Sequence, residues 1–258
     1  MDRRRGELRL VMRYLTSTLG LATVFILLGA DPAGAQPLPR ITIAVNAGYQ
    51  PSTTSFDDRF TFDLNRETAS VETDYPIDAG PLFDAGFGYR FWKGLGAGIA
   101  VSRFSVDSTV QAQATLPHPL FFQRNRQISG ETGGLTRDET GIHIQAQYHL
   151  APFSGLYVVL AGGPSVFDIT QSIVTDVNFT EAFPYDTATY VGVDSQRGTG
   201  TKTGFNVGAD LRWMFARHIG VGGLVRYSHA TVDLTRNGRT ISVDAGGMQA
   251  GGGIRFAF

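Results

Sequence analysis

The sequence predicts an all-β protein, an eight-stranded antiparallel up-and-down transmembrane β-barrel, with ten strands as the alternative. Three observations predict it. Apolar and polar residues alternate along most of the 258-residue chain, whereas helical periodicity is hard to find. Compact turns alternate with long polar connections. The chain also ends in GIRFAF, an alternating stretch that stops on an aromatic residue, although soluble domains usually let their last residues fray.

Residues 1–35 are predicted to be a cleaved signal peptide that precedes the barrel domain, residues 36–258. Five arginines come before the apolar run YLTSTLGLATVFILLG, and Ala33 and Ala35 then frame a small-residue cleavage site before Gln36. A retained transmembrane anchor is the alternative, but it would need about 20 apolar residues, and the polar residues TST interrupt this run. Translation starts at either Met1 or Met12.

Composition excludes several classes of protein. The chain has 22 Lys and Arg against 23 Asp and Glu, which is not the charge of a nucleic-acid-binding protein. It has no cysteine, so disulfides and thiolate metal sites are excluded. After the leader no stretch approaches 18 consecutive apolar residues, so no membrane-spanning helix is predicted. The mean hydropathy of −0.04 still fits a membrane barrel, which shows lipid only every second residue.

Each predicted strand has one apolar and one polar face. In LFDAGFGYRFW, for example, Phe83, Phe87 and Tyr89 oppose Asp84 and Arg90. The apolar faces are rich in large aromatic residues, and the interior of an eight-stranded barrel is barely wide enough to hold side chains of that size. The apolar faces are therefore predicted to point outward to lipid. The predicted strands are roughly 40–50, 80–92, 95–106, 140–151, 156–169, 203–216, 219–234 and 240–258.

Short turns and long connections alternate along the chain. Turns are predicted around Lys93, Pro152 and Arg217, and long loops over 51–80, 108–140 and 170–202. In outer-membrane barrels the turns face the periplasm and the loops face outside. The last connection is a tight hairpin at Asn237-Gly238.

Two local features leave the strand pattern open. The stretch FTFDLNRETASVETDYPI is either a further hairpin above the membrane or an extra strand pair in a ten-stranded barrel. The apolar face slips between Ile241-Val243-Ala245 and Met248-Ala250-Gly252, which predicts a β-bulge.

The end of the chain carries a resemblance to a known family. Ile254, Phe256 and Phe258 resemble the C-terminal assembly signal of bacterial outer-membrane proteins. The last strand is expected to close on the first near Ile41, since backbone groups in lipid must find internal partners. The mature chain resembles the small porin-like barrels of the OmpA, OmpX and OmpW type. The resemblance implies a place in the Gram-negative cell envelope, in the outer membrane, with the barrel-assembly machinery and lipopolysaccharide as partners.

Polar residues of the inward faces are the candidate site. They are predicted to pair and fill the interior, since an uncompensated buried charge is costly; the alternative is a polar path for small solutes. His143 and His149 lie about 20 Å apart along one strand at ~3.3 Å per residue, so they cannot share a metal ion. The predicted lumen residues are Asp84, Arg90, His143, Gln145, Gln147, His149, Asp210, Arg212, Arg226, Gln249 and Arg255.

Aromatic residues are expected to mark both membrane surfaces. Tyr49, Phe104 and Tyr227 are assigned to the outer level, where Arg103 is expected to meet lipopolysaccharide phosphates. The periplasmic girdle is assigned to Phe91, Trp92, Tyr148, Trp213 and Phe215.

No residue pattern predicts catalysis, a metal or a cofactor. Ser228 and His229 are adjacent on a strand and face opposite ways, so they cannot form a nucleophile–base pair. PHPLFF, residues 117–122, is an apolar patch in a polar loop that either packs locally, covers the barrel mouth or meets a hydrophobic partner. The predicted role is structural or surface-interacting. The alternatives are an OmpW-like channel for small or hydrophobic solutes, a barrel enzyme acting on lipid A, and a soluble secreted barrel.

Overall fold

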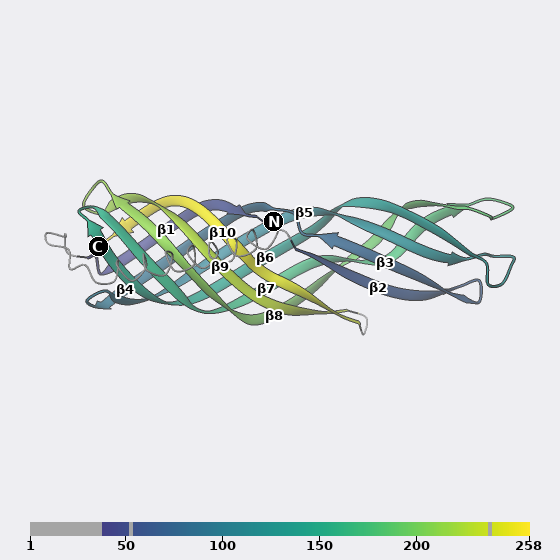
Figure 1. The fold of residues 1–258 in the computed structure, drawn as a ribbon, viewed down its shortest axis with the longest axis horizontal. Helices are drawn as coiled ribbons and strands as arrows, with labels where there is room; N and C mark the ends of the chain where they lie inside the picture. Colours follow the sequence, from purple (N-terminus) through teal and green to yellow (C-terminus); the bar gives the residue numbers. More distant parts are fainter. Residues whose placement is uncertain (1–37, 52–53, 237–238) are drawn as a thin grey trace, which may run out of the picture.

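The computed structural model describes residues 38–51, 54–236 and 239–258, and the predicted signal peptide and the Asn237-Gly238 turn lie outside these ranges. The described chain is an antiparallel sheet of ten strands, eight of which close into a ring in the order β1-β4-β5-β6-β7-β8-β9-β10 (Figure 1). The strands are β1 (Ile41–Gln50), β2 (Ser55–Leu64), β3 (Glu67–Pro76), β4 (Gly80–Trp92), β5 (Leu95–Pro117), β6 (Asn125–Phe153), β7 (Leu156–Glu181), β8 (Ala188–Met214), β9 (Ile219–Arg236) and β10 (Arg239–Ala257).

The ring closes between the first and the last strand, as predicted. β10 pairs with β1 from Thr42 opposite Ala257 to Tyr49 opposite Ala250. The Phe258 N–H donates to the Ile41 carbonyl at 2.9 Å, and the Ile41 N–H donates back to the Phe258 carbonyl at 2.9 Å. The terminal residue therefore completes the ladder and removes the sheet edge that lipid would not tolerate.

Four strands run far beyond the length that a membrane requires. β5, β6, β7 and β8 have 23, 29, 26 and 27 residues, whereas about 9–11 residues suffice to cross a bilayer. The long loops predicted over 108–140 and 170–202 are therefore wrong: most of both ranges is strand, and the connections are only 118–124 and 182–187. We call the part of the sheet beyond the ring the extension; it forms the right half of Figure 1.

The first connection contains a hairpin that joins the extension and not the ring. β2 pairs with β3, and Ser70–Asp74 of β3 pairs with Gln111–Thr115 of β5. β1 pairs directly with β4, with Gln50 opposite Gly80 at the end of the ladder. Of the two alternatives, the hairpin above the membrane is correct and the ten-stranded ring is wrong.

The apolar face of several strands changes side along their length. On β9, Val221 and Val225 are exposed on the outside, whereas Val232 and Leu234 are wholly buried on the inside. Within the ring the outside meets lipid, so the outward face is apolar; in the extension the outside meets water, so the inward face is apolar.

The same change of side explains why the apolar residues of β10 shift from odd positions, 241–245, to even positions, 248–252. The ladder between β9 and β10 runs without a register shift from Arg239 to Phe256, so the predicted β-bulge is wrong. Ile241 and Val243 point inward in the extension, and Met248 and Ile254 point outward in the ring. The strand keeps its alternation, and only its surroundings change.

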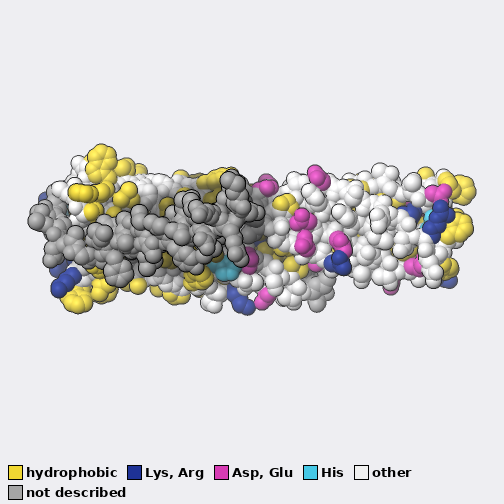
Figure 2. Space-filling view, in the orientation of Figure 1, with side chains coloured by type: hydrophobic (Ala, Val, Ile, Leu, Met, Phe, Trp, Pro, Cys, Tyr) yellow, Lys and Arg dark blue, Asp and Glu magenta, His cyan; other side chains and the backbone are white. Residues whose placement is uncertain are grey.

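The exposed apolar side chains form a belt around the ring, seen as the yellow groups on the left of Figure 2 where they are not covered. At the turn end Phe91, Trp92, Trp213 and Phe215 are each about 60 % exposed, and Tyr148 is half-buried. Phe104, predicted at the outer level, is 1 % exposed and points inward, because the β5 register turns Val101 and Arg103 outward. No helix in the described ranges is long and apolar enough to cross a membrane.

The extension has apolar cores of its own. One cluster lies where the ring passes into the extension, and two further clusters lie toward the tip, covered by inward side chains of the β2–β3 hairpin. Phe56 and Tyr75 of this hairpin stack at 4.4 Å between ring centroids, and the Tyr75 hydroxyl accepts the Val174 N–H at 2.8 Å. The first cluster consists of Phe167, Ile169, Ile173, Ala230, Val232, Leu234, Ile241, Val243 and Ala245.

Candidate functional site

The ring interior contains the polar residues that the alternation assigned to it. Of the eleven predicted lumen residues ten are buried, and only Arg90 is half-buried. Arg90 lies at the turn end, where its guanidinium donates to the carbonyls of Leu38, Pro39 and Lys93. Eight of the other groups form three clusters at successive levels of the barrel, and the buried Gln147 and His149 lie outside them.

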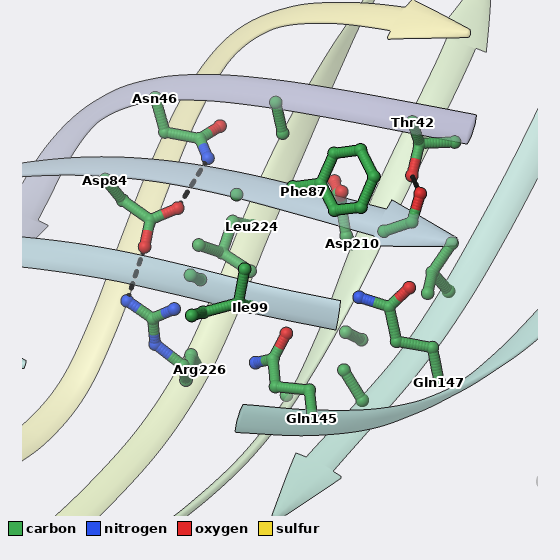
Figure 3. Close-up of a pocket in the computed structure, with 18 of the residues that line it drawn as sticks. Thr42, Asn46, Asp84, Phe87, Ile99, Gln145, Gln147, Asp210, Leu224 and Arg226 are labelled. Carbon is green, nitrogen blue, oxygen red and sulfur yellow. Dashed lines mark hydrogen bonds and ion pairs between the residues drawn. The ribbon is translucent and has the colours of Figure 1, made fainter. Parts of the chain in front are cut away.

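The middle cluster is an ion pair that spans the lumen. Arg226 of β9 donates through Nη2 to Asp84 Oδ2 of β4 at 2.7 Å, and β1 and β10 separate these strands in the ring. Asn46 Nδ2 donates to the other carboxylate oxygen at 2.9 Å, as Figure 3 shows. Arg226 Nε also donates to Gln249 Oε1 at 2.9 Å, and Gln249 Nε2 donates to Gln50 Oε1 at 2.8 Å.

The cluster at the turn end places one carboxylate between two arginines. Arg212 Nε donates to Asp210 Oδ2 at 2.7 Å, and Arg255 Nη2 donates to Asp210 Oδ1 at 2.7 Å. Arg255 reaches from β10 over β9 to β8, and it passes above Gly222. A Cβ at Gly222 would lie 2.4 Å from the Leu211 carbonyl oxygen and 2.8 Å from Arg255 Nε, so only glycine fits at this position beneath the bridge.

The third cluster surrounds His143, which is wholly buried. Its Nε2 lies 2.9 Å from Ser102 Oγ, and its Nδ1 lies 2.8 Å from Ser165 Oγ. Asn206 Nδ2 donates to Ser165 Oγ at 2.9 Å, and Gln145 Nε2 donates to Asn206 Oδ1 at 2.9 Å.

A serine beside a histidine invites comparison with a hydrolase, but this geometry does not fit one. A catalytic histidine needs a group that orients it and stabilises its charge, commonly a carboxylate. In that position His143 has the Ser165 hydroxyl. Ser102 is 3 % exposed, so a substrate has no access to it. Sequence reasoning missed Ser102 and Ser165, because small polar residues on an inward face carry no distinct signal.

A small cavity separates the middle cluster from the cluster at the turn end. Its volume is about 40 Å³, and Figure 3 shows Asn46, Gln145, Gln147, Asp210 and Arg226 around it. Gln147 Oε1 and Asn46 Oδ1 have no hydrogen-bond partner among the described residues. At roughly 10–15 Å³ per water the cavity has room for about three molecules, which would satisfy these oxygens.

The interior is closed toward the extension by apolar side chains and one buried ion pair. The His143 ring lies 5.7 Å from the ring of Phe167, the first residue of the apolar cluster. Arg137 Nη2 donates to Glu139 Oε2 at 3.3 Å and to the Asp244 carbonyl at 2.6 Å. Both residues were missed because sequence reasoning placed them in a loop over 108–140.

Glu139 lies beyond the membrane-spanning part of β6, since the outward belt on that strand ends at Ile142. Its Oε1 accepts the Gly246 N–H at 2.8 Å. Burial raises the pKa of Glu139, and Arg137 and the Gly246 N–H oppose that change. The same burial lowers the pKa of the Arg137 guanidinium.

Ser228 and His229 lie on opposite faces of β9, as their adjacency requires. Ser228 is wholly buried, and the half-buried His229 has its ring 6.2 Å from that of Phe205 on the outside. No group of three or more His, Asp and Glu side chains within the described ranges is placed to hold a metal ion.

A second candidate site lies at the tip of the extension, where the patch 117–122 is found. Leu120, Phe121 and Phe122 are 57 %, 54 % and 73 % exposed, and Phe183 in the neighbouring connection is 79 % exposed. They account for apolar groups at the right-hand end of Figure 2. Of the three alternatives for this patch, covering of the barrel mouth is wrong, because the patch lies at the far end of the extension.

Ion pairs hold the two tip connections together. Arg124 Nη2 lies 2.9 Å from Asp186 Oδ1, and the buried Arg126 donates to Glu181 at 2.5 Å and to the Tyr185 carbonyl at 3.2 Å. The buried His118 accepts the Leu120 N–H through Nδ1 at 3.0 Å. The apolar side chains therefore stand on connected loops and not on free ends.

The eight-stranded ring is closed, and it has an apolar exterior, a polar interior and short turns at one end. These features define the protein as a small transmembrane β-barrel of the bacterial outer membrane. The closed ring within such a belt contradicts the soluble-barrel alternative, since an exposed apolar surface of this extent is not found on soluble proteins.

No protein-family model matches the chain, and no curated protein matches its sequence. It is similar to the solved structure of outer membrane protein OprG from Pseudomonas aeruginosa, with 10% identity over 87% of this chain and 99% of that one and a TM-score of 0.45. It is also similar to outer membrane protein AlkL in DMPC lipid bilayers, with 15% identity over 89% of this chain and 94% of that one and a TM-score of 0.40. A third similar structure is Ail of Yersinia pestis in complex with the heparin analogue sucrose octasulfate, with 10% identity over 84% of this chain and 99% of that one and a TM-score of 0.37. Since these scores are low, the class rests on the geometry of this chain.

Proposed function

We propose that the protein is a non-conducting, non-catalytic outer-membrane barrel that anchors a rigid β-extension and presents its tip for contact at the cell surface. The observation that carries this proposal is the continuation of the strands. β6 runs over 125–140 before it enters the belt, roughly 50 Å of strand at ~3.3 Å per residue. A chain that served only as an anchor would have no use for a projection of this length with its own apolar cores.

The contents of the barrel favour anchoring over transport. The lumen is crossed by the Asp84–Arg226 ion pair, and the apolar cluster of Phe167, Val232 and Leu234 lies beyond it. A channel of the OmpW kind remains the second candidate, and the cavity of about 40 Å³ beside Gln147 is the feature that favours it. That cavity is too small for a hydrophobic solute.

The exterior supports two partner assignments within this proposal. Arg103 is exposed beside Phe83 at the outer rim, where it pairs with Asp138 at 3.2 Å and can also reach a lipopolysaccharide phosphate. Ile254, Phe256 and Phe258 lie on the strand that closes the ring, where an assembly machinery would read them.

Two measurements test the function. In planar bilayers the purified protein is expected to remain silent in potassium chloride and in other salts, and steady single-channel steps would favour the channel. An epitope inserted after Phe122 is expected to be accessible to antibody on intact cells. An inaccessible epitope in a heat-modifiable, folded barrel would contradict the surface role.

Catalysis is tested separately. Expression of the protein is expected to leave the mass of lipid A unchanged, because Ser102 and His143 are closed to substrate. A new lipid A species that disappears in Ser102→Ala would contradict the non-catalytic assignment.

A further inference from the structure

We propose that the tip inserts into the lipid bilayer of a facing surface, through the side chains of Leu120, Phe121, Phe122 and Phe183. This inference rests on the proposed surface role and names the partner of the tip. The four residues form what we call the tip cluster.

The tip cluster is held in place before any partner arrives. The connection 118–124 is closed at its base by the His118 N–H, which donates to the Arg124 carbonyl at 2.8 Å. It is tied to β3 by the Gln123 N–H, which donates to Glu67 Oε1 at 2.9 Å. The Phe121 ring lies 5.0 Å from the ring of the buried His118 and 5.6 Å from the Arg124 guanidinium. The loop backbone and the Phe121 ring are therefore already ordered, and they lose little conformational entropy on binding.

The shape of the tip cluster favours lipid over a protein partner. Its four side chains stand on the ends of two loops, and together they expose roughly 500 Å² of apolar surface at 150–250 Å² for a large aromatic group. A stable protein–protein interface buries about 800 Å² on each partner. The hollow beside Phe183 is lined by Ala182 and Pro184 but mostly by polar residues, so it is a poor apolar groove for an incoming segment. The polar residues are Thr180, Glu181, Asp186, Thr187 and Thr189.

The charges at the tip indicate which lipids are involved. Arg124 is paired with Asp186, and Arg126 with Glu181. The β2–β3 turn beside the connection adds the exposed Arg66 next to Glu67, so three acids balance three cations at the tip. A compensated tip has little attraction for anionic headgroups. Insertion is therefore expected to depend on the apolar phase and to be similar for zwitterionic and anionic bilayers.

The test uses the full protein in lipid nanodiscs together with separate vesicles of phosphatidylcholine that carry brominated acyl chains. The two native tryptophans, Trp92 and Trp213, lie in the girdle of the barrel, within the nanodisc. In Phe122→Trp the added indole is expected to be quenched on addition of the brominated vesicles, and the wild-type emission is expected to stay unchanged.

Flotation with vesicles gives the matched comparison. Phe122→Ser with Phe183→Ser is expected to reduce flotation at least tenfold. Val191→Ser, which removes an apolar side chain that is 63 % exposed on the flank of β8, is expected to leave flotation unchanged. Addition of phosphatidylglycerol to the vesicles is expected to change the wild-type value by less than twofold.

The outcomes separate this inference from the proposed function. An added indole that stays unquenched in Phe122→Trp, or equal losses in the serine variants and Val191→Ser, would overturn lipid insertion. Pairs of nanodiscs that form without vesicles would overturn it in favour of a second copy of the chain. A third outcome is an accessible epitope after Phe122, no conductance in planar bilayers and no binding of the protein to vesicles. In that case the surface role is retained and only lipid is excluded as the partner.

Discussion

The Arg226 guanidinium lies 2.7 Å from the Asp84 carboxylate, on two strands that β1 and β10 separate in the ring. Neighbouring strands are already joined by their backbone ladders, whereas this pair joins two strands that are three steps apart around the ring. The contact therefore both braces the barrel and obstructs its lumen.

Loss of one partner of this pair is expected to destabilise the barrel. Asp84→Ala leaves the wholly buried Arg226 uncompensated, and removal of one partner of a buried pair costs about 3–5 kcal/mol. Urea unfolding in lipid vesicles measures the change. Asp138→Ala, which breaks the exposed pair with Arg103, is the control and is expected to cost no more than about 1 kcal/mol. Equal losses in both variants would contradict the bracing role.

Removal of both partners is expected not to open a channel. In Asp84→Ala with Arg226→Ala the middle of the lumen is cleared, but the apolar cluster around Phe167 and Val232 still closes the outer end. Planar bilayers are therefore expected to stay silent. Steady conductance in this double variant would show that the ion pair alone had blocked the barrel.

The Arg255–Asp210 bridge is expected to depend on glycine at position 222. Gly222→Val would place side-chain atoms against the Leu211 carbonyl oxygen and where the Arg255 guanidinium passes, and such overpacking costs about 1–3 kcal/mol. Gly223→Val is the matched control, because a Cβ there meets no atom closer than 3.7 Å. Thermal unfolding in detergent compares the two. If the Gly223 variant lost as much stability, crowding against Leu211 and Arg255 would not be the cause.

The β2–β3 hairpin is expected to be dispensable for the ring but needed for the extension. Gln50 and Gly80 are paired, so a short turn can replace residues 51–79. The shortened protein should still shift its gel mobility on heating. Loss of Phe56 and Tyr75 uncovers the apolar side chains of Val110 and Val174, so proteolysis within 108–136 and 173–199 should become faster than in the wild type. A shortened chain that fails to fold would show that the hairpin is part of barrel assembly.

Single cysteines on β9 are expected to report the change of side. The native chain has no cysteine, so each label reports one position. Val225→Cys should react only with a lipid-soluble maleimide, Thr231→Cys with a water-soluble one, and Val232→Cys with neither until urea unfolds the protein. Labelling of Val232→Cys in the folded protein would contradict an inward apolar core.

The ring could be predicted because lipid imposes a strict pattern on it. Every strand that crosses must show apolar groups outward and polar or small groups inward, so Asp84, Arg226 and Arg255 could be assigned to the interior from their parity alone. Their partners could not be assigned. The odd or even position of a residue along its strand shows only which face of the sheet it occupies. The strand order and register decide that Asp84 meets Arg226 across the lumen and that Asp210 meets two arginines.

The composition of the extension predicts loops, although its residues alternate as they do in a strand. Val110, Ala112, Ala114 and Leu116 alternate with polar residues, but the stretch around them is rich in Ser, Thr and Gln. A sheet whose outside faces water has the same alternation as one that faces lipid, with the sides exchanged. The apparent slip between Ala245 and Met248 was the sign of that exchange.

The amino-acid sequence by itself determined that the chain is a β-barrel whose last residue closes the ring, because side-chain alternation and backbone pairing are local consequences of strand geometry. Only the tertiary structure decided that the barrel is filled, that its strands continue into a projection and that Phe122 and Phe183 stand on neighbouring connections at the tip. Those features depend on which distant residues are brought together, and spacing along a strand does not contain that information.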